Sequence, residues 1–92
     1  MFTGTPVKRT GRDRFLRNVL IAIGNAAPSY AELAAAARRC LDDGSPLVRA
    51  AAVWAYSRLA SASSWEAERA LRLEREPESL VREEWLRPRE ER

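Results

Sequence analysis

The 92-residue chain contains no histidine and a single cysteine, Cys40. Without histidine, the chain lacks the commonest general base and the commonest transition-metal ligand. A lone cysteine forms no intramolecular disulfide and cannot by itself hold an iron–sulfur cluster or a structural zinc ion. These absences argue against a catalytic centre, and we expect no cofactor in this chain alone. A single cysteine also favours a reducing, cytoplasmic compartment.

Long apolar runs are absent as well. The run at residues 19–23 has five residues and the run at residues 50–56 has seven, whereas a membrane helix needs about 20 apolar residues. The first residues also lack an apolar stretch like that of a secretory signal. We therefore expect a soluble, cytoplasmic protein with no membrane partner.

What the sequence does contain is a repeat. Three short segments each place an arginine directly after two apolar residues, and these arginines are Arg17, Arg49 and Arg82. They lie 32 and 33 positions apart, an interval typical of helical-repeat solenoids, in which each hairpin buries its apolar face on its neighbours. Because the chain is rich in arginine and alanine, a chance match is the alternative.

Helix start and stop signals predict about five helices, at residues 12–25, 30–43, 46–61, 64–75 and 78–87. Their caps are Ser45 followed by Pro46, and two capping-box patterns, Ser29 with Glu32 and Ser63 with Glu66. The predicted fold is all-α, a short HEAT-like solenoid over residues 12–87. An extended basic arm, residues 1–11, precedes it, and a frayed tail, residues 88–92, follows it.

Charge is unevenly distributed. Residues 1–40 hold seven Lys and Arg against two acids, whereas residues 65–92 hold seven arginines against nine glutamates. A basic N-terminal half indicates an anionic partner, usually a nucleic acid, bound through phosphates without reading of the base sequence. The alternative is a solvated face that keeps a small domain soluble. The candidate nucleic-acid-binding residues are Lys8, Arg9, Arg12, Arg14 and Arg17.

Two acidic residues precede repeat arginines by six positions: Asp43 before Arg49, and Glu76 before Arg82. HEAT-type repeats tie neighbouring repeats together with acid–arginine pairs at about this spacing, because an arginine fork binds a carboxylate bidentately. We therefore expect two structural acid–arginine pairs. Arg17 has Gly11 at the matching position, which leaves it free to contact something outside the chain.

Four segments carry a resemblance to a known family: residues 3–12 (TGTPVKRTGR), 14–25 (RFLRNVLIAIGN), 45–55 (SPLVRAAAVWA) and 81–85 (VREEW). Together they resemble the C-terminal HEAT-like region of bacterial epoxyqueuosine reductases. The first two segments together are the most specific part of the match. The third alone would fit many HEAT-like proteins.

The resemblance implies a role in queuosine biosynthesis, a tRNA modification. Members of that family reduce epoxyqueuosine to queuosine at the wobble position of certain tRNAs, using cobalamin and two 4Fe–4S clusters held by upstream domains. The C-terminal region packs on that catalytic core and helps to hold the tRNA. The present chain lacks the cluster-binding cysteine run and the cobalamin domain, so it resembles a non-catalytic fragment and no catalytic residue can be carried over.

The resemblance implies two partners: tRNA, bound through the basic arm and first helix, and the catalytic domains of the same enzyme. DNA is not expected. A different class of function stays open, namely a free-standing helical-repeat adaptor that binds another protein. An autonomous enzyme is disfavoured because the sequence has no histidine and no nucleophile motif.

Overall fold

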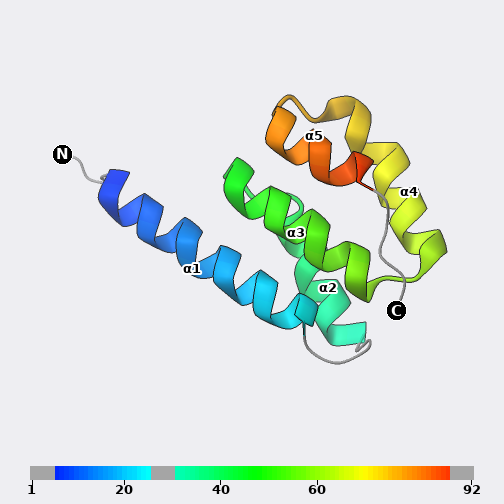
Figure 1. Cartoon of the computed structure of the whole chain (residues 1–92), viewed down its shortest axis with the longest axis horizontal. Coiled ribbons are helices and arrows are strands. Elements are labelled where there is room, and N and C mark those ends of the chain that lie inside the picture. The colour runs from blue at the N-terminus through cyan, green and yellow to red at the C-terminus, as the bar shows by residue number, and fades with distance from the viewer. Residues whose placement is uncertain (1–5, 26–30, 88–92) are drawn as a thin grey trace.

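The computed structural model describes residues 6–25 and 31–87, with side chains from residue 11 onward. Every element in this part of the chain is helical, which confirms the all-α prediction (Figure 1). The elements are α1 (Pro6–Asn25), α2 (Ala31–Cys40), α3 (Pro46–Leu59), α4 (Ala62–Arg72), the short 3-10 helix η1 (Leu73–Arg75) and α5 (Ser79–Leu86).

Helix α3 is the centre of the fold. Helices α1 and α5 flank it and α2 packs behind it, so that α1, α3 and α5 follow one another across one side of the molecule (Figure 1). Val48, Ala52 and Ala55 are completely buried on α3. The small alanine side chains let the neighbouring backbones approach α3 closely, so that a short helix can hold three others around it.

The start of α3 follows the sequence signals. Ser45 is the N-cap, and its Oγ accepts a hydrogen bond from the Val48 N–H at 3.4 Å. Pro46 occupies the first helical position, where its missing N–H costs nothing. The Asp43 carboxylate accepts the Ser45 N–H at 2.9 Å. The loop before α3 is therefore fixed by side-chain acceptors, as the cap prediction requires.

The N-terminal boundary differs from the prediction. Helix α1 begins at Pro6 rather than near residue 12, so residues 6–11 are helical and not part of an extended arm. Proline is well suited to a first helical position, and Gly11 is tolerated inside a helix at a cost of about 1 kcal/mol. Residues 1–5 of the predicted arm and the predicted tail, residues 88–92, lie outside the described residues.

The start of α4 also differs from the prediction. Ser61, not Ser63, is the N-cap, and its Oγ accepts the Ser64 N–H at 3.2 Å. Ser61 has extended backbone angles, whereas Ser63 already lies in the first turn of α4. Of the other capping-box pair, Ser29 lies outside the described residues, and Glu32 lies in the first turn of α2.

The repeat positions behave alike in the core. Leu20, Ala52 and Trp85 coincide when the three repeat arginines are aligned, and all three are buried. Val48 and Val81, which precede their arginines, are also buried, while Leu16 is half-buried against the same core. Trp85 stacks on Trp65 of α4 with ring centroids 4.9 Å apart. Equivalent positions of α1, α3 and α5 thus face one continuous core.

One position on α1 requires glycine. A Cβ built on Gly24 would lie 2.5 Å from Cζ3 of Trp54, closer than any real side-chain contact. The Trp54 ring therefore lies directly on the α1 backbone. The Arg58 guanidinium lies 5.3 Å from the centroid of the Trp54 ring, and its Nε donates to the Gly24 carbonyl at 2.8 Å. This contact fixes the C-terminal end of α1 on α3.

Candidate functional site

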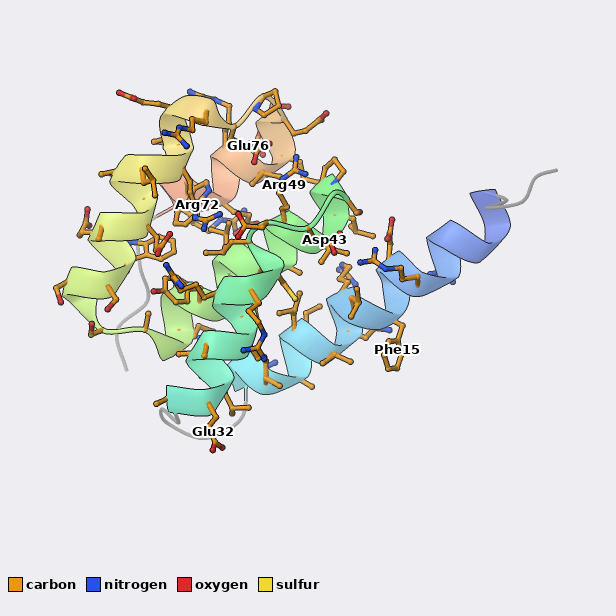
Figure 2. All side chains as sticks on the ribbon, turned by 180° about the vertical axis from the view of Figure 1, so that it is seen from behind. Phe15, Glu32, Asp43, Arg49, Arg72 and Glu76 are labelled. Atoms are coloured by element: carbon orange, nitrogen blue, oxygen red, sulfur yellow. The ribbon has the colours of Figure 1, made fainter. Side chains whose placement is uncertain are left out.

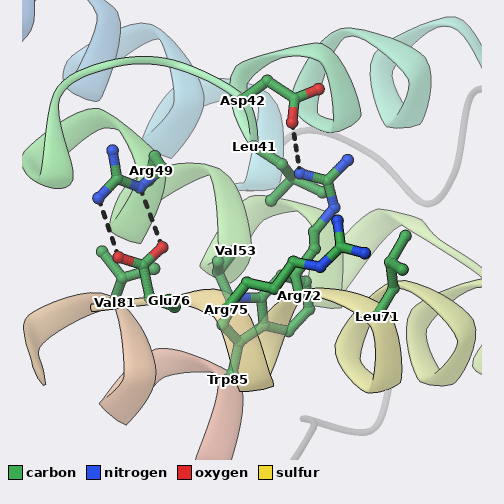
Figure 3. A pocket seen from close by; sticks show the side chains of 10 residues that line it. All are labelled: Leu41, Asp42, Arg49, Val53, Leu71, Arg72, Arg75, Glu76, Val81 and Trp85. Carbon is green, nitrogen blue, oxygen red and sulfur yellow. Dashed lines mark hydrogen bonds and ion pairs between the residues drawn. The ribbon is translucent and has the colours of Figure 1, made fainter. Parts of the chain in front are cut away.

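Arg49, in the first turn of α3, donates hydrogen bonds through all three of its guanidinium nitrogens. Its Nε and Nη2 donate to the two carboxylate oxygens of Glu76 at 3.0 and 2.9 Å (Figure 3), and its Nη1 donates to the Asp43 main-chain carbonyl at 2.9 Å. The side chains of Arg49 and Glu76 are only 16% and 9% exposed. This bidentate geometry ties α3 to the loop before α5.

The carboxylate of Asp43 binds a different arginine. Arg12, on α1, donates through both terminal nitrogens to the two oxygens of Asp43, and also pairs with Asp13 at 2.9 Å. These hydrogen bonds from Arg12, together with the Ser45 N–H, hold the pKa of Asp43 below its usual range despite partial burial. The first helix is therefore joined to the loop before α3 by charge, as α3 is joined to the loop before α5.

Arg82, in the first turn of α5, repeats the main-chain contact of Arg49. Its Nη1 donates to the Leu73 carbonyl at 2.9 Å and to the Glu76 carbonyl at 3.2 Å. The two predicted pairs thus come together, but through the carbonyl of the acidic residue rather than its carboxylate. Each carboxylate instead binds an arginine from the preceding helix pair. We call this series the arginine ladder, and its members are Arg12, Asp43, Arg49, Glu76 and Arg82.

The electrostatics of Glu76 reflect its place in the ladder. Burial opposes ionisation of this carboxyl group. Hydrogen bonds from Arg49 and from the Glu78 N–H outweigh that effect, so the pKa of Glu76 lies below its usual range. The lowered pKa favours the ionised form of Glu76, in which both carboxylate oxygens accept from Arg49.

A second charged network joins α2 to α4. Glu68, which is buried, accepts from Arg38 at 2.7 Å and from Arg72 at 2.6 Å. Arg72 also pairs with Asp42 at 2.7 Å. Arg72, Asp42, Arg49 and Glu76 line a pocket of about 230 Å³ between α3, η1 and α5, floored by apolar side chains such as Val53 and Trp85 (Figure 3).

Four of the charged side chains that line this pocket are paired, Arg49 with Glu76 and Arg72 with Asp42, and Arg75 is a fifth charged lining residue. Within residues 6–25 and 31–87, no group of three or more Asp, Glu, Cys or His side chains is placed to hold a metal ion. No helix in this part of the chain is long and apolar enough to cross a membrane.

The candidate nucleic-acid-binding residues divide into three kinds. Lys8 and Arg9 lie in α1 by their backbone, but their side chains lie outside the description. Arg12 is held by Asp43 and Asp13. Arg14 and Arg17 are exposed and have no acidic partner among the described residues, and their spacing puts them on one face of α1. Of the five candidates, Arg14 and Arg17 are therefore the two whose side chains are described, exposed and without an acidic partner among the described residues.

Part of the predicted apolar stripe of α1 faces solvent. Phe15 is 66% exposed and points away from the rest of the molecule, and Val19 is also exposed (Figure 2). Both belong to the apolar stripe that helical periodicity gives this helix, together with Leu16, Leu20 and Ile23. The other edge of the stripe, Leu16, Leu20 and Ile23, suffices to cover α3. We call Phe15 with Val19 the uncovered face of α1. Periodicity shows which residues share a face but not what covers it, so the sequence alone does not say which part of the stripe is exposed.

A groove also separates the helices of the repeat. It has a volume of about 350 Å³ and a mainly apolar lining. Ala50, Ala51 and Trp54 of α3 contribute to it, with Arg17 of α1 and Glu84 of α5 among its other lining residues. The groove could have been anticipated only from the small residues at positions 50 and 51.

These features define a small all-helical unit in the described part of the chain. The chain is similar to part of two curated epoxyqueuosine reductases. It is 44% identical over 54 residues to the enzyme of Xanthomonas campestris pv. campestris, a match that covers 59% of this chain and 15% of the relative. It is 38% identical over 63 residues to the enzyme of Alicycliphilus denitrificans, covering 62% of this chain and 18% of the relative.

The resemblance seen in the sequence is thereby confirmed. The match spans less than a fifth of the length of either curated relative. No family model and no solved structure matches the chain.

Proposed function

We propose that the chain is a non-catalytic, HEAT-like module of a tRNA epoxyqueuosine reductase, which packs on the catalytic part and contributes to holding the tRNA. The observation that carries the assignment is the similarity to two epoxyqueuosine reductases, 38–44% identical over about three-fifths of the chain. The HEAT-like description is supported by the equivalent burial of repeat positions and by the arginine ladder.

The role in holding tRNA rests on α1. Arg14 and Arg17 are exposed cations without an acidic partner among the described residues, and Lys8 and Arg9 belong to the same helix. Such residues bind phosphates, release counterions and give a binding constant that falls steeply with salt. Arg12 contributes less to this surface because Asp43 occupies its terminal nitrogens.

The uncovered face of α1 supports packing on a larger protein. Its residues Phe15 and Val19 correspond in the repeat to Leu47 and Ala51 of α3. Leu47 and Ala51 line the groove together with α1 residues, so in α3 the same positions have a helix beside them. A helix of the catalytic part would cover Phe15 and Val19 in the same way, and this burial would favour association.

The experiment compares tRNA binding by the wild-type chain and by the Arg14→Glu/Arg17→Glu variant across a salt series. We expect the variant to bind about 10-fold or more weakly and its salt slope to be smaller by about 2, one unit for each lost phosphate contact. The matched control is Arg75→Glu, which reverses an exposed arginine with no partner in the described residues on the far side of α3. Equal weakening by both variants would contradict a specific surface on α1.

The alternative function, a free-standing helical-repeat adaptor, is favoured by one observation, the apolar groove between α1, α3 and α5. Binding of a protein segment there would depend on burial of apolar surface and would change little with salt. A chain that fails to bind tRNA at low salt would make the adaptor the better proposal.

A further inference from the structure

The arginine ladder is open at its C-terminal end. Arg82 is the repeat equivalent of Arg49, and Nη1 of each arginine donates to the main-chain carbonyl of the acidic residue six positions earlier. The other edge of the Arg49 guanidinium, formed by Nε and Nη2, donates two hydrogen bonds to the carboxylate of Glu76. No carboxylate among the described residues contacts the corresponding edge of Arg82. Arg82 therefore makes the carbonyl contact that Arg49 makes, but the carboxylate contact of Arg49 has no equivalent at Arg82 among the described residues.

The apolar surface beside this edge is open too. Val53 follows Arg49 by four positions and is only 1% exposed, on the side of α3 where Val81 of α5 lies. Its repeat equivalent is Leu86, which follows Arg82 by four positions and is 56% exposed. Two independent features of α5, one charged and one apolar, thus lack the neighbour that their equivalents on α3 possess.

We propose that Arg82 and Leu86 form a docking surface for a protein segment that presents a carboxylate to Arg82 and an aliphatic side chain to Leu86. The chain already contains the pattern that fits such a surface. Glu76 binds Arg49, and Val81, five positions later, is buried beside Val53. The partner is therefore a loop-and-helix segment with a carboxylate five positions before an aliphatic residue.

Charge argues against a nucleic acid at this surface. Residues 76–87 contain four glutamates and two arginines, so the electrostatic field there repels a polyphosphate but admits one hydrogen-bonded carboxylate. A second copy of this chain that continued the repeat after α5 would place its first repeat beside Arg82. That repeat has Gly11 at the position that Asp43 and Glu76 occupy in the other two, so it supplies no carboxylate there. The inference is independent of the proposed tRNA role of α1.

The test extends the whole chain after Arg92 by a flexible glycine–serine linker and a second copy of residues 73–87. The linker gives the added segment an effective concentration in the millimolar range, so that even weak docking is detected. Two versions are compared, one with the native sequence in the added copy and one with E76Q in the added copy alone. This pair leaves the ladder of the original chain untouched.

We expect the native version to melt about 5 °C above the E76Q version, because a charge-assisted pair contributes on this scale in a domain of this size. This difference in melting temperature should disappear when the original chain carries Arg82→Gln. It should persist when the original chain carries the control substitution Arg87→Gln, which removes a neighbouring exposed arginine. Equal melting temperatures in the wild-type background would overturn the proposal. So would a difference that survives Arg82→Gln.

A second measurement keeps the proposal falsifiable if Arg82→Gln does not fold. The Nε–Hε resonance of Arg82 should shift in the native version relative to the E76Q version, while that of Arg49 stays in place. A shift at Arg49 instead would mean that the added segment displaces α5, which overturns the proposal. Loss of tRNA binding in Arg82→Gln equal to that of Arg14→Glu/Arg17→Glu would also overturn it, in favour of a phosphate ligand.

Discussion

Arg49 and Glu76 lie 27 positions apart in the sequence and share two parallel hydrogen bonds of 3.0 and 2.9 Å. Both side chains are largely removed from water. A buried pair of this kind contributes little net stability relative to an apolar pair, but removal of one partner leaves an uncompensated charge. The pair joins α3 to the loop before α5, and we predict that the stability of the fold depends on both members being present.

The first prediction concerns this pair. The substitution Arg49→Gln should lower the free energy of unfolding by about 3 kcal/mol, because the carboxylate of Glu76 is left buried without its arginine partner. Urea unfolding followed by circular dichroism measures the loss. The control, Arg75→Gln, removes an exposed arginine without a described partner and should change stability by less than about 0.5 kcal/mol. Similar losses in the two variants would contradict a structural role for Arg49.

The second prediction concerns pH. The folded-state pKa values of Asp43, Glu68 and Glu76 are lowered. For Asp43 the main cause is hydrogen bonding to Arg12. For Glu68 the hydrogen bonds from Arg72 and Arg38 outweigh burial, and for Glu76 those from Arg49 and the Glu78 N–H do so. The unfolded chain therefore takes up protons first as the pH falls. Stability should be fully present above the ordinary carboxyl pKa values, about 4, and should decline as the pH falls through the lower folded-state values.

Urea unfolding between pH 7 and pH 3 checks this dependence. Glu76→Gln should give a shallower decline with acid, since the variant has lost one of the carboxylates that drive it. Glu74→Gln is the matched control, because Glu74 is exposed and has no partner among the described residues. An unchanged slope in Glu76→Gln would show that Glu76 does not carry the acid sensitivity.

The third prediction separates two glycines of α1. Gly24→Ala places a Cβ against the Trp54 ring, at 2.5 Å from Cζ3, and should destabilise the fold by about 1–3 kcal/mol through overpacking. Gly11→Ala meets nothing within 4 Å and should stabilise the fold by about 0.4–1 kcal/mol, since alanine restricts the unfolded chain. Thermal melting ranks the two variants against the wild type. The opposite ranking would mean that the ring does not rest on Gly24.

The fourth prediction concerns the start of α4. Ser61→Ala removes the acceptor of the Ser64 N–H and should lower stability by about 1 kcal/mol. Ser63→Ala lies inside the first turn and should change stability by only a few tenths of a kcal/mol. Chemical unfolding of both variants measures the difference. A larger effect at Ser63 would restore the cap position suggested by the capping-box pattern.

Much of the architecture could be predicted from the sequence. The repeat period, the cap at Ser45 and the helix-ending signals lead to an all-α chain, with α3 and α5 placed to within about two residues. Local signals suffice there because serine caps and proline positions act on neighbouring backbone groups. They failed at residues 6–11, where glycine, threonine and basic residues carry no helical periodicity and yet extend α1.

The partners in the ladder could be predicted only in part. A spacing of six positions brings Asp43 near Arg49, and Glu76 near Arg82. Whether the arginine meets the carbonyl or the carboxylate depends on which other arginine approaches the acid. That arginine comes from a preceding helix about 30 positions away, and its approach is a tertiary effect that no local pattern encodes.

Helix α3 lies between the two helices whose surfaces are proposed to bind partners. The extensive contacts of α1 and of α5 are with α3. Sites that share no side chains and lie on opposite sides of a rigid element contribute to the free energy almost additively. A ligand on Arg14 and Arg17 and a ligand on Arg82 should therefore bind without cooperativity, so that the chain could bridge two macromolecules while transmitting no signal between them.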